Sequence, residues 1–166
     1  MQIAAASVKE LRERTGAGIL DCRRALEQTN GDLDKAATLL LEQGLAKAQK
    51  KTDRPVGQGI VEAYLHGSRI GVLVELNCET DFVARTDEFK GLAHDIALQI
   101  AAMNPLYVSA GEMPPESTDD PAEVALLRQP SIKEPNRTVQ DRITETIAKL
   151  GENIQVRRFV RFEVGR

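Results

Sequence analysis

The spacing of apolar residues changes partway along the chain. Before residue 44, apolar side chains recur every three or four positions, as on one face of a helix. From residue 59 onwards several segments alternate apolar and polar residues, which is typical of strands with one buried face. The pattern therefore predicts a helical N-terminal region followed by a region that mixes strands and helices.

The N-terminal region predicts three short helices joined by tight turns. Ser7 and Glu10 have the spacing of a capping box at the start of the first helix. Asp32 can cap the third helix, and Gly44 is expected to interrupt it. A bundle this small is only marginally stable by itself, so we interpret it as a docking module. The polar and basic residues 47–55 then form a linker.

The second region predicts a hairpin, two longer helices and a final strand. Residues 60–65 and 70–76 alternate on either side of a connection in which Gly67 can adopt positive φ. Asp87 is expected to cap a helix whose apolar residues form one continuous stripe. A long surface excursion with a brief helix at Pro121 follows, and then a helix from Thr138. The stripe consists of Phe89, Leu92, Ala93, Ile96, Ala97, Ile100 and Ala101.

Together these elements predict an α+β fold. Residues 1–54 would form an N-terminal three-helix (UBA-like) module with its basic linker. Residues 55–166 would form a core of three antiparallel strands with helices packed on one face. The last strand has Val156, Val160, Phe162 and Val164 among three arginines and Phe159, so both sheet faces carry apolar side chains. The second face could pair with another copy or a partner, although an ordinary half-exposed sheet explains it equally well.

Composition excludes several classes of protein. Contents of 42% hydrophobic and 28% charged residues are those of a globular chain. The net charge of −3 argues against a dedicated nucleic-acid binder, although the basic residues 47–54 leave contact with RNA open. Cys22 and Cys78 have no paired spacing, which indicates reduced thiols in a cytosolic protein. No apolar run is long enough to span a membrane, and we expect a cytoplasmic protein.

The residues of common catalytic sites are sparse. His66 and His94 are the only histidines, and the sequence has neither a zinc-ligand cluster nor a complete phosphate-binding loop. We therefore expect no metal or cofactor, and an interaction protein rather than an enzyme acting on small molecules. One alternative stays open: a thiol or redox enzyme that uses Cys78 as nucleophile, with His66 across the hairpin as its base.

The alternation of the second strand breaks at Thr80, Asp81, Phe82 and Val83, shortly before the next helix. A carboxylate and a large aromatic at such a junction stand on a rigid scaffold that can present them to a partner. The opposing interpretation is that Phe82 packs inward and Asp81 merely caps a helix. Exposed aromatic residues are the rarer case, so these four residues alone favour inward packing.

Three motifs, in order along the chain, resemble the elongation factor Ts family of bacterial type. The first is residues 11–18 with Asp21 and Cys22, and the second is residues 66–74 with residues 77–83. The third comprises residues 151–154 and the C-terminal strand. The likeness covers essentially the whole chain and corresponds to the short form of the family, with one copy of the strand–helix core.

The resemblance implies a guanine-nucleotide exchange factor for elongation factor Tu. In that family, the segment that matches residues 80–83 enters the GTPase beside its Mg²⁺ and phosphate site. Phe82 would wedge between partner helices, and Asp81 would disturb the surroundings of the metal. Arg12, Ile19 and Leu20 would anchor the N-terminal module on the GTPase. The short form is also expected to form a homodimer through its sheet, and no direct contact with nucleic acid is expected.

Overall fold

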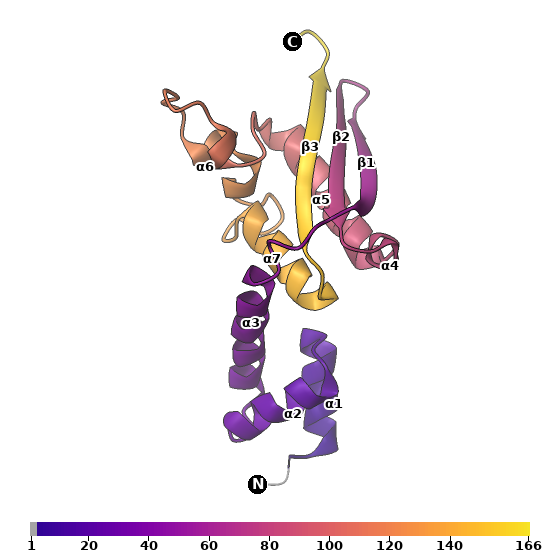
Figure 1. Ribbon diagram of the computed structural model, residues 1–166, viewed down its shortest axis with the longest axis vertical. Helices are drawn as coiled ribbons and strands as arrows, with labels where there is room; N and C mark the ends of the chain where they lie inside the picture. The colour runs from indigo at the N-terminus through magenta and orange to yellow at the C-terminus, as the bar shows by residue number, and fades with distance from the viewer. Residues whose placement is uncertain (1–2) are drawn as a thin grey trace.

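The helical region and the strand-containing region form opposite ends of an elongated molecule (Figure 1). The computed structural model describes residues 3–166. One end holds α1 (Ala5–Thr15), α2 (Ile19–Gln28) and α3 (Leu33–Gln49). The other holds β1 (Gln58–His66), β2 (Ile70–Cys78), α4 (Asp81–Ala84), α5 (Asp87–Met103), α7 (Val139–Leu150) and β3 (Ile154–Glu163), with η1 (Ala110–Glu112), α6 (Pro121–Val124) and η2 (Leu126–Arg128) between α5 and α7. The predicted α+β class is confirmed.

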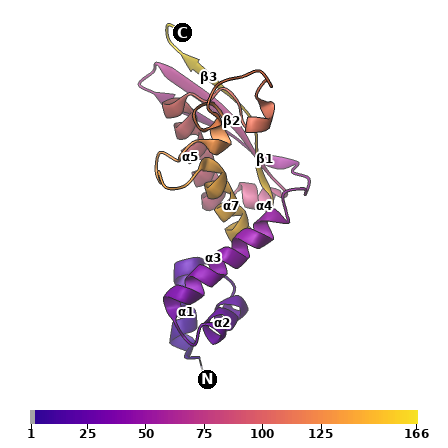
Figure 2. The ribbon, with the colours of Figure 1, turned by 90° about the vertical axis from the view of Figure 1, so that its left-hand side faces the viewer.

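The three strands form one antiparallel sheet in the order β1-β2-β3. Gly67 and Ser68 both have positive φ in the β1–β2 connection, and the amide of Arg69 donates to the carbonyl of His66. This is the backbone of a tight hairpin turn, whose twist matches that of the strands. Helix α5 lies against one face of the sheet (Figure 2). Its apolar stripe is buried there, and β2 buries every second residue on the same face. The predicted helix-covered face is therefore confirmed.

A β-bulge in β3 divides the apolar residues of this strand between the two faces. Glu75 pairs with Arg158 while Leu76 pairs with Val156, which makes Arg157 the extra residue. Val156 therefore points into the core. After the bulge the alternation is reversed, so that Val160 and Phe162 point outwards. The resulting open sheet face consists of Val61, Leu65, Leu73, Val160 and Phe162, all of which are exposed. Apolar side chains on both faces are thus observed.

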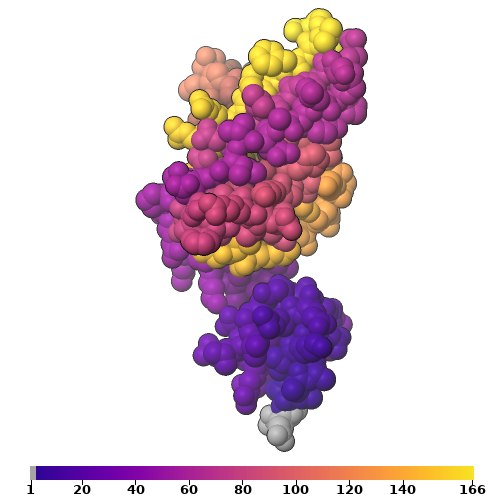
Figure 3. All heavy atoms as spheres, turned by 90° about the vertical axis from the view of Figure 1, so that its right-hand side faces the viewer, coloured from indigo at the N-terminus to yellow at the C-terminus, as the bar shows by residue number. Residues whose placement is uncertain are grey.

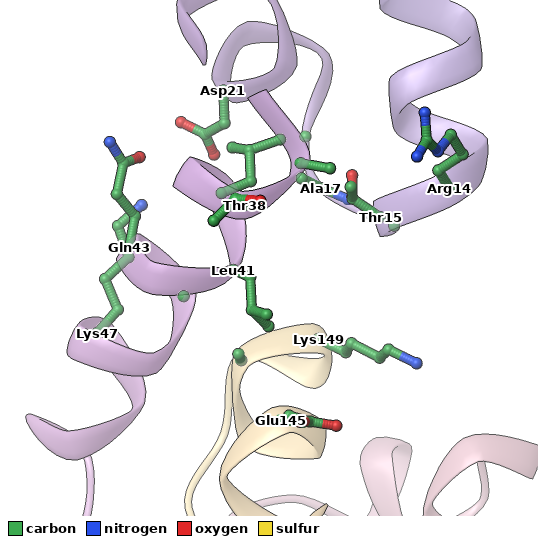
Figure 4. A pocket seen from close by; sticks show the side chains of 16 residues that line it. Arg14, Thr15, Ala17, Asp21, Thr38, Leu41, Gln43, Lys47, Glu145 and Lys149 are labelled. Carbon is green, nitrogen blue, oxygen red and sulfur yellow. The ribbon is translucent and has the colours of Figure 1, made fainter. Parts of the chain in front are cut away.

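Helix α3 does not stop at Gly44, and that prediction is wrong. The helix runs on to Gln49 and crosses α7, where a Cβ on Gly44 would lie only 3.2 Å from that of Ala148. The molecule narrows at this level (Figure 3). Beside the crossing lies a cleft between the α1–α2 connection, α3 and α7, with Leu41 directed towards α7 (Figure 4). Glycine is thus used here for close packing of two helices and not as a breaker.

The predicted helix starts are partly right. The Asp32 side chain accepts from the amides of Asp34 and Lys35 and caps α3 as expected. The capping box at Ser7 is wrong, because α1 begins at Ala5 and Ser7 already lies in its first turn. The cap of α5 is Thr86 and not Asp87, which is the first residue of the helix. The first error shifts the helix start by three residues, and the second shifts it by one, which is within the usual uncertainty of helix ends.

The residues after α3 are fixed to the core by hydrogen bonds. The Lys51 ammonium donates to the carbonyl of Gly151 at 3.0 Å. The Asn153 side chain donates to the carbonyls of Thr52 and Arg54, at 3.1 and 2.7 Å. The solvated linker expected here is therefore an ordered connection. Among residues 3–166, the helices are all too short or too polar to cross a membrane.

Candidate functional site

Phe82 lies on a single helical turn that directs its ring into solvent. We call residues 80–83 the Phe82 turn. The hydroxyl of Thr80 accepts from the amide of Val83 and caps α4, and Val83 and Ala84 are both buried in the core. Because the turn is anchored through these two residues, Phe82 on its other side stays 77% exposed. The interpretation in which Phe82 packs inward is therefore wrong.

Asp81 is half-exposed beside Phe82 and forms an ion pair. Its carboxylate lies 2.8 Å from the Arg85 guanidinium, one helical turn further along. The cap of α4 is supplied by Thr80, so Asp81 does not have the capping role that the alternative interpretation gave it. An exposed pair of this kind contributes little to stability, and the Asp81 carboxylate can change partners at small cost.

A carboxylate from a distant part of the chain supports the Phe82 turn. Glu152 accepts hydrogen bonds from the amides of Glu79 and Thr80, at 3.1 and 3.0 Å, and from the Thr80 hydroxyl. In return, the Glu79 carboxylate accepts from the amide of Asn153 at 2.8 Å. Sequence reasoning did not select Glu152. Its only signal was its place in the motif at residues 151–154, because hydrogen bonds across more than 70 residues leave no local pattern.

The three residues selected in the N-terminal module are all exposed. Arg12 on α1 and Ile19 on α2 line one shallow hollow, together with Val8 and other residues of the same two helices. Leu20 follows on α2, and its side chain also faces solvent. The module and the α4–α5 region lie on the same side of the molecule, the side that faces the viewer in Figure 3.

Cys78 lacks the surroundings of a nucleophile. Its side chain is fully buried, and the thiol donates to the carbonyl of Thr80 at 3.1 Å. Burial raises the pKa of the Cys78 thiol, and the Glu152 carboxylate raises this pKa further, so the reactive thiolate is disfavoured.

The proposed base of Cys78 is also far away. The strand register pairs His66 with Ile70 and pairs Cys78 with Gln58, at the opposite end of the hairpin. At about 3.3 Å per residue, this register separates His66 from Cys78 by roughly 25 Å. Within residues 3–166, His, Cys, Asp and Glu side chains form no group of three or more that could hold a metal ion. The structure thus gives the thiol-enzyme hypothesis no support.

Comparison with known proteins identifies the family. The family model described as Elongation factor TS matches residues 41–129, more than half of the chain. The chain is 53% identical to Elongation factor Ts of Carboxydothermus hydrogenoformans, with 98% of this chain and 89% of the relative covered. It is 50% identical to Elongation factor Ts of Heliobacterium modesticaldum, covering 98% and 90%. For Elongation factor Ts of Thermodesulfovibrio yellowstonii the identity is 47%, covering 99% and 98%.

These alignments extend over 194 residues, whereas the chain has 166. The relatives therefore carry additional residues that have no counterpart here. Even so, the likeness includes nearly the whole chain, from the N-terminal helices to the last strand. The chain belongs to the elongation factor Ts family.

Proposed function

We propose that this chain promotes release of GDP from elongation factor Tu by inserting the Phe82 turn beside the Mg²⁺ and phosphate site of the GTPase. Membership of the elongation factor Ts family supports the exchange role in translation elongation. The observation that carries the insertion step is the exposure of Phe82, a large aromatic side chain directly before the buried anchor residues Val83 and Ala84. An exposed aromatic residue on a rigid turn is suited to fill a pocket on a partner.

Each residue of the Phe82 turn has a distinct part in this proposal. The Phe82 ring enters an apolar gap between helices of the GTPase, and Asp81 brings a carboxylate close to the metal. Mg²⁺ bridges nucleotide phosphates to protein oxygens, so disturbing its coordination weakens the retention of GDP. Thr80 and Val83 support the turn from within this chain: Thr80 caps it, and Val83 anchors it in the core.

The N-terminal module supplies the second contact with the GTPase. We propose that residues 1–54 act as a docking module, and that residues 55–166 form the core that presents the Phe82 turn. Arg12 and Ile19 meet in one hollow, and Leu20 extends this apolar surface along α2. The exposed apolar side chains give affinity on burial, and the guanidinium can pair with a carboxylate of the partner.

In this mechanism the factor alters a binding equilibrium and leaves the nucleotide chemically unchanged. Thermodynamic linkage requires the effect to be reciprocal. If the bound factor weakens GDP binding about a hundredfold, or about 2.7 kcal/mol, then GDP weakens binding of the factor by the same amount. Rebinding of nucleotide therefore expels the factor, which allows it to act in catalytic amounts.

The test measures release of a fluorescent GDP analogue from elongation factor Tu with catalytic amounts of this protein. Wild type should accelerate release strongly. Phe82→Ala should slow the accelerated rate by about tenfold or more, since a buried aromatic anchor contributes about 2 kcal/mol. Its melting temperature should stay unchanged, because the ring is exposed.

Leu106→Ala is the matched control for Phe82→Ala. Leu106 is likewise an exposed apolar residue but follows the far end of α5, so its removal should leave the release rate unchanged. A folded wild type that does not accelerate release would overturn the exchange function. Equal activity of Phe82→Ala and wild type would overturn the insertion step alone.

We also propose that two copies of the chain associate through the open sheet face. The face is apolar at its centre, where Leu73 of β2 pairs with Ala63 of β1 and Val160 of β3, and exposed Val61 lies diagonally across from Leu73. The ion pair of Glu75 and Arg158, at 2.8 Å, borders this apolar area. Two such faces can pack together as the layers of a β-sandwich, whose inner side chains interdigitate.

A further inference from the structure

The turn between α7 and β3, residues 151–153, touches the two parts of the chain that carry the proposed contacts with the GTPase. On one side it binds the segment that leaves α3. The carbonyl of Gly151 accepts from Lys51, and the Asn153 side chain donates to the carbonyls of Thr52 and Arg54. Asn153 itself is almost fully buried, whereas residues 52–54 stay exposed. The α7–β3 turn thus holds the end of the N-terminal module.

On its other side, the α7–β3 turn holds the Phe82 turn. One oxygen of the Glu152 carboxylate accepts from the amides of Glu79 and Thr80, and the other accepts from the Thr80 hydroxyl. The Glu79 carboxylate closes a reciprocal arrangement, because it accepts from the amide of Asn153. Two adjacent backbone segments are therefore joined by four hydrogen bonds, each with a carboxylate as acceptor. Hydrogen bonds to an ionised acceptor are shorter and stronger than neutral ones.

This support matters because α4 has only four residues. A single helical turn is not stable by itself, so its direction has to be set by contacts with the rest of the fold, which are the burial of Val83 and Ala84 and the hydrogen bonds at its N-terminal flank. The backbone enters α4 through Thr80, and the amides of Glu79 and Thr80 are the ones that Glu152 holds. Phe82 follows two residues later, so the direction of its ring depends on the backbone at Thr80.

We propose that Glu152 is a positioning residue for nucleotide exchange, acting through Thr80 to hold the Phe82 ring in its productive direction. The proposal rests on the proposed function, since it assumes that Phe82 enters the GTPase. It adds that a residue outside the contact surface sets the rate of exchange. Its neighbour Asn153 binds the segment that follows α3, so the same α7–β3 turn connects the Phe82 turn with the end of the N-terminal module.

The experiment measures GDP release from elongation factor Tu at increasing concentrations of Glu152→Ala, Glu152→Gln and wild type. Glu152→Ala should lower the maximal release rate about tenfold. Its half-saturating concentration should change less than about threefold, because the module surface is intact. Glu152→Gln should recover most of the rate, since the amide oxygen can still accept from both backbone amides and its NH₂ group can donate to the Thr80 hydroxyl.

Two further variants separate positioning from general stability. With the double variant Glu152→Ala/Phe82→Ala, the rate of GDP release from elongation factor Tu should equal that with Phe82→Ala within about twofold. Without the ring, Glu152 has no side chain left to position. Glu145→Ala removes another half-buried carboxylate from the same part of the chain, one that pairs with Arg137 instead. This control should keep the wild-type maximal rate.

Amide hydrogen exchange measures how well the Phe82 turn is ordered in the absence of the partner. Exchange at residues 79–84 should be faster in Glu152→Ala than in wild type and unchanged in Glu145→Ala. If wild type does not accelerate GDP release from elongation factor Tu, the proposed function fails. Amide hydrogen exchange still decides in that case whether Glu152 orders the turn. An unchanged exchange pattern, a wild-type maximal rate in Glu152→Ala, or losses that add fully to those of Phe82→Ala would each overturn the role of Glu152.

Discussion

At the scale of single residues, a pair of buried glutamines holds the long excursion between α5 and α7 in place. Gln99 lies on the buried side of α5 and is only 2% exposed. Its side chain donates to the carbonyl of Pro130 at 3.0 Å and accepts from the amide of Ile132 at 2.9 Å. Gln129, also buried, donates to the carbonyl of Glu123. These side chains supply the hydrogen bonds that a loop cannot obtain from a helix or sheet.

Replacing Gln99 by Leu should therefore destabilise the protein although it makes the core more apolar. The buried side-chain oxygen of Gln129 would lose its donor, and the carbonyl of Pro130 and the amide of Ile132 would lose their partners, at a cost of about 1–3 kcal/mol. Urea unfolding of Gln99→Leu measures this loss of free energy. Gln140→Leu, at an exposed position of α7, should change the free energy of unfolding by less than about 0.5 kcal/mol. Equal stability of both variants would contradict the argument.

The same scale shows which parts of the candidate site could be predicted. The break in alternation after Cys78 located the Phe82 turn correctly. The direction of the ring could not be predicted, because it depends on the burial of Val83 and Ala84 against distant elements. Glu152 was missed for a related reason, since its partners lie more than 70 residues away. Local patterns identify where a site begins, whereas tertiary contacts decide what it presents.

At the scale of elements, both notable departures from the predicted fold come from packing between segments. The period of two in β3 is interrupted at Arg157 by a bulge, which sends Val156 inwards and Phe162 outwards. Gly44 is a residue type that often breaks helices, but here it lies where α3 and α7 are in close contact. The order and type of the main elements follow from hydrophobic period alone. Bulges and close helix crossings depend on the strand or helix that packs alongside, and the hydrophobic period of one segment carries no information about that partner.

The crossing of α3 and α7 can be tested with two glycines in helices. Gly44→Leu would force a side chain against Ala148 and should destabilise the protein by about 1–3 kcal/mol. Gly91 of α5 faces open space, so Gly91→Leu should stabilise it by about 0.5–1 kcal/mol through helix propensity. Thermal unfolding of both variants gives the comparison. Stabilisation by both would show that α3 and α7 are not in close contact.

At the scale of the whole molecule, the proposed association of two copies should depend on the centre of the open sheet face. Wild type should sediment at twice its chain mass of 18.2 kDa at micromolar concentration. Leu73→Glu should sediment as a monomer, because a carboxylate on the middle strand cannot be buried without a partner. Leu106→Glu serves as a control that stays dimeric. A monomeric wild type, or a dimeric Leu73→Glu, would contradict the proposal.

The uninterrupted helix α3 has one more consequence for the proposed exchange reaction. It joins the two proposed contact regions as a stiff spacer. The chain is therefore a bivalent ligand whose two binding regions stay at a fixed separation. Once the N-terminal module has bound, insertion of Phe82 becomes an intramolecular step, with an effective concentration set by geometry. The ring can then enter and leave the GTPase many times during a single encounter. A weak wedge is therefore sufficient for fast exchange, provided that the spacer keeps its angle.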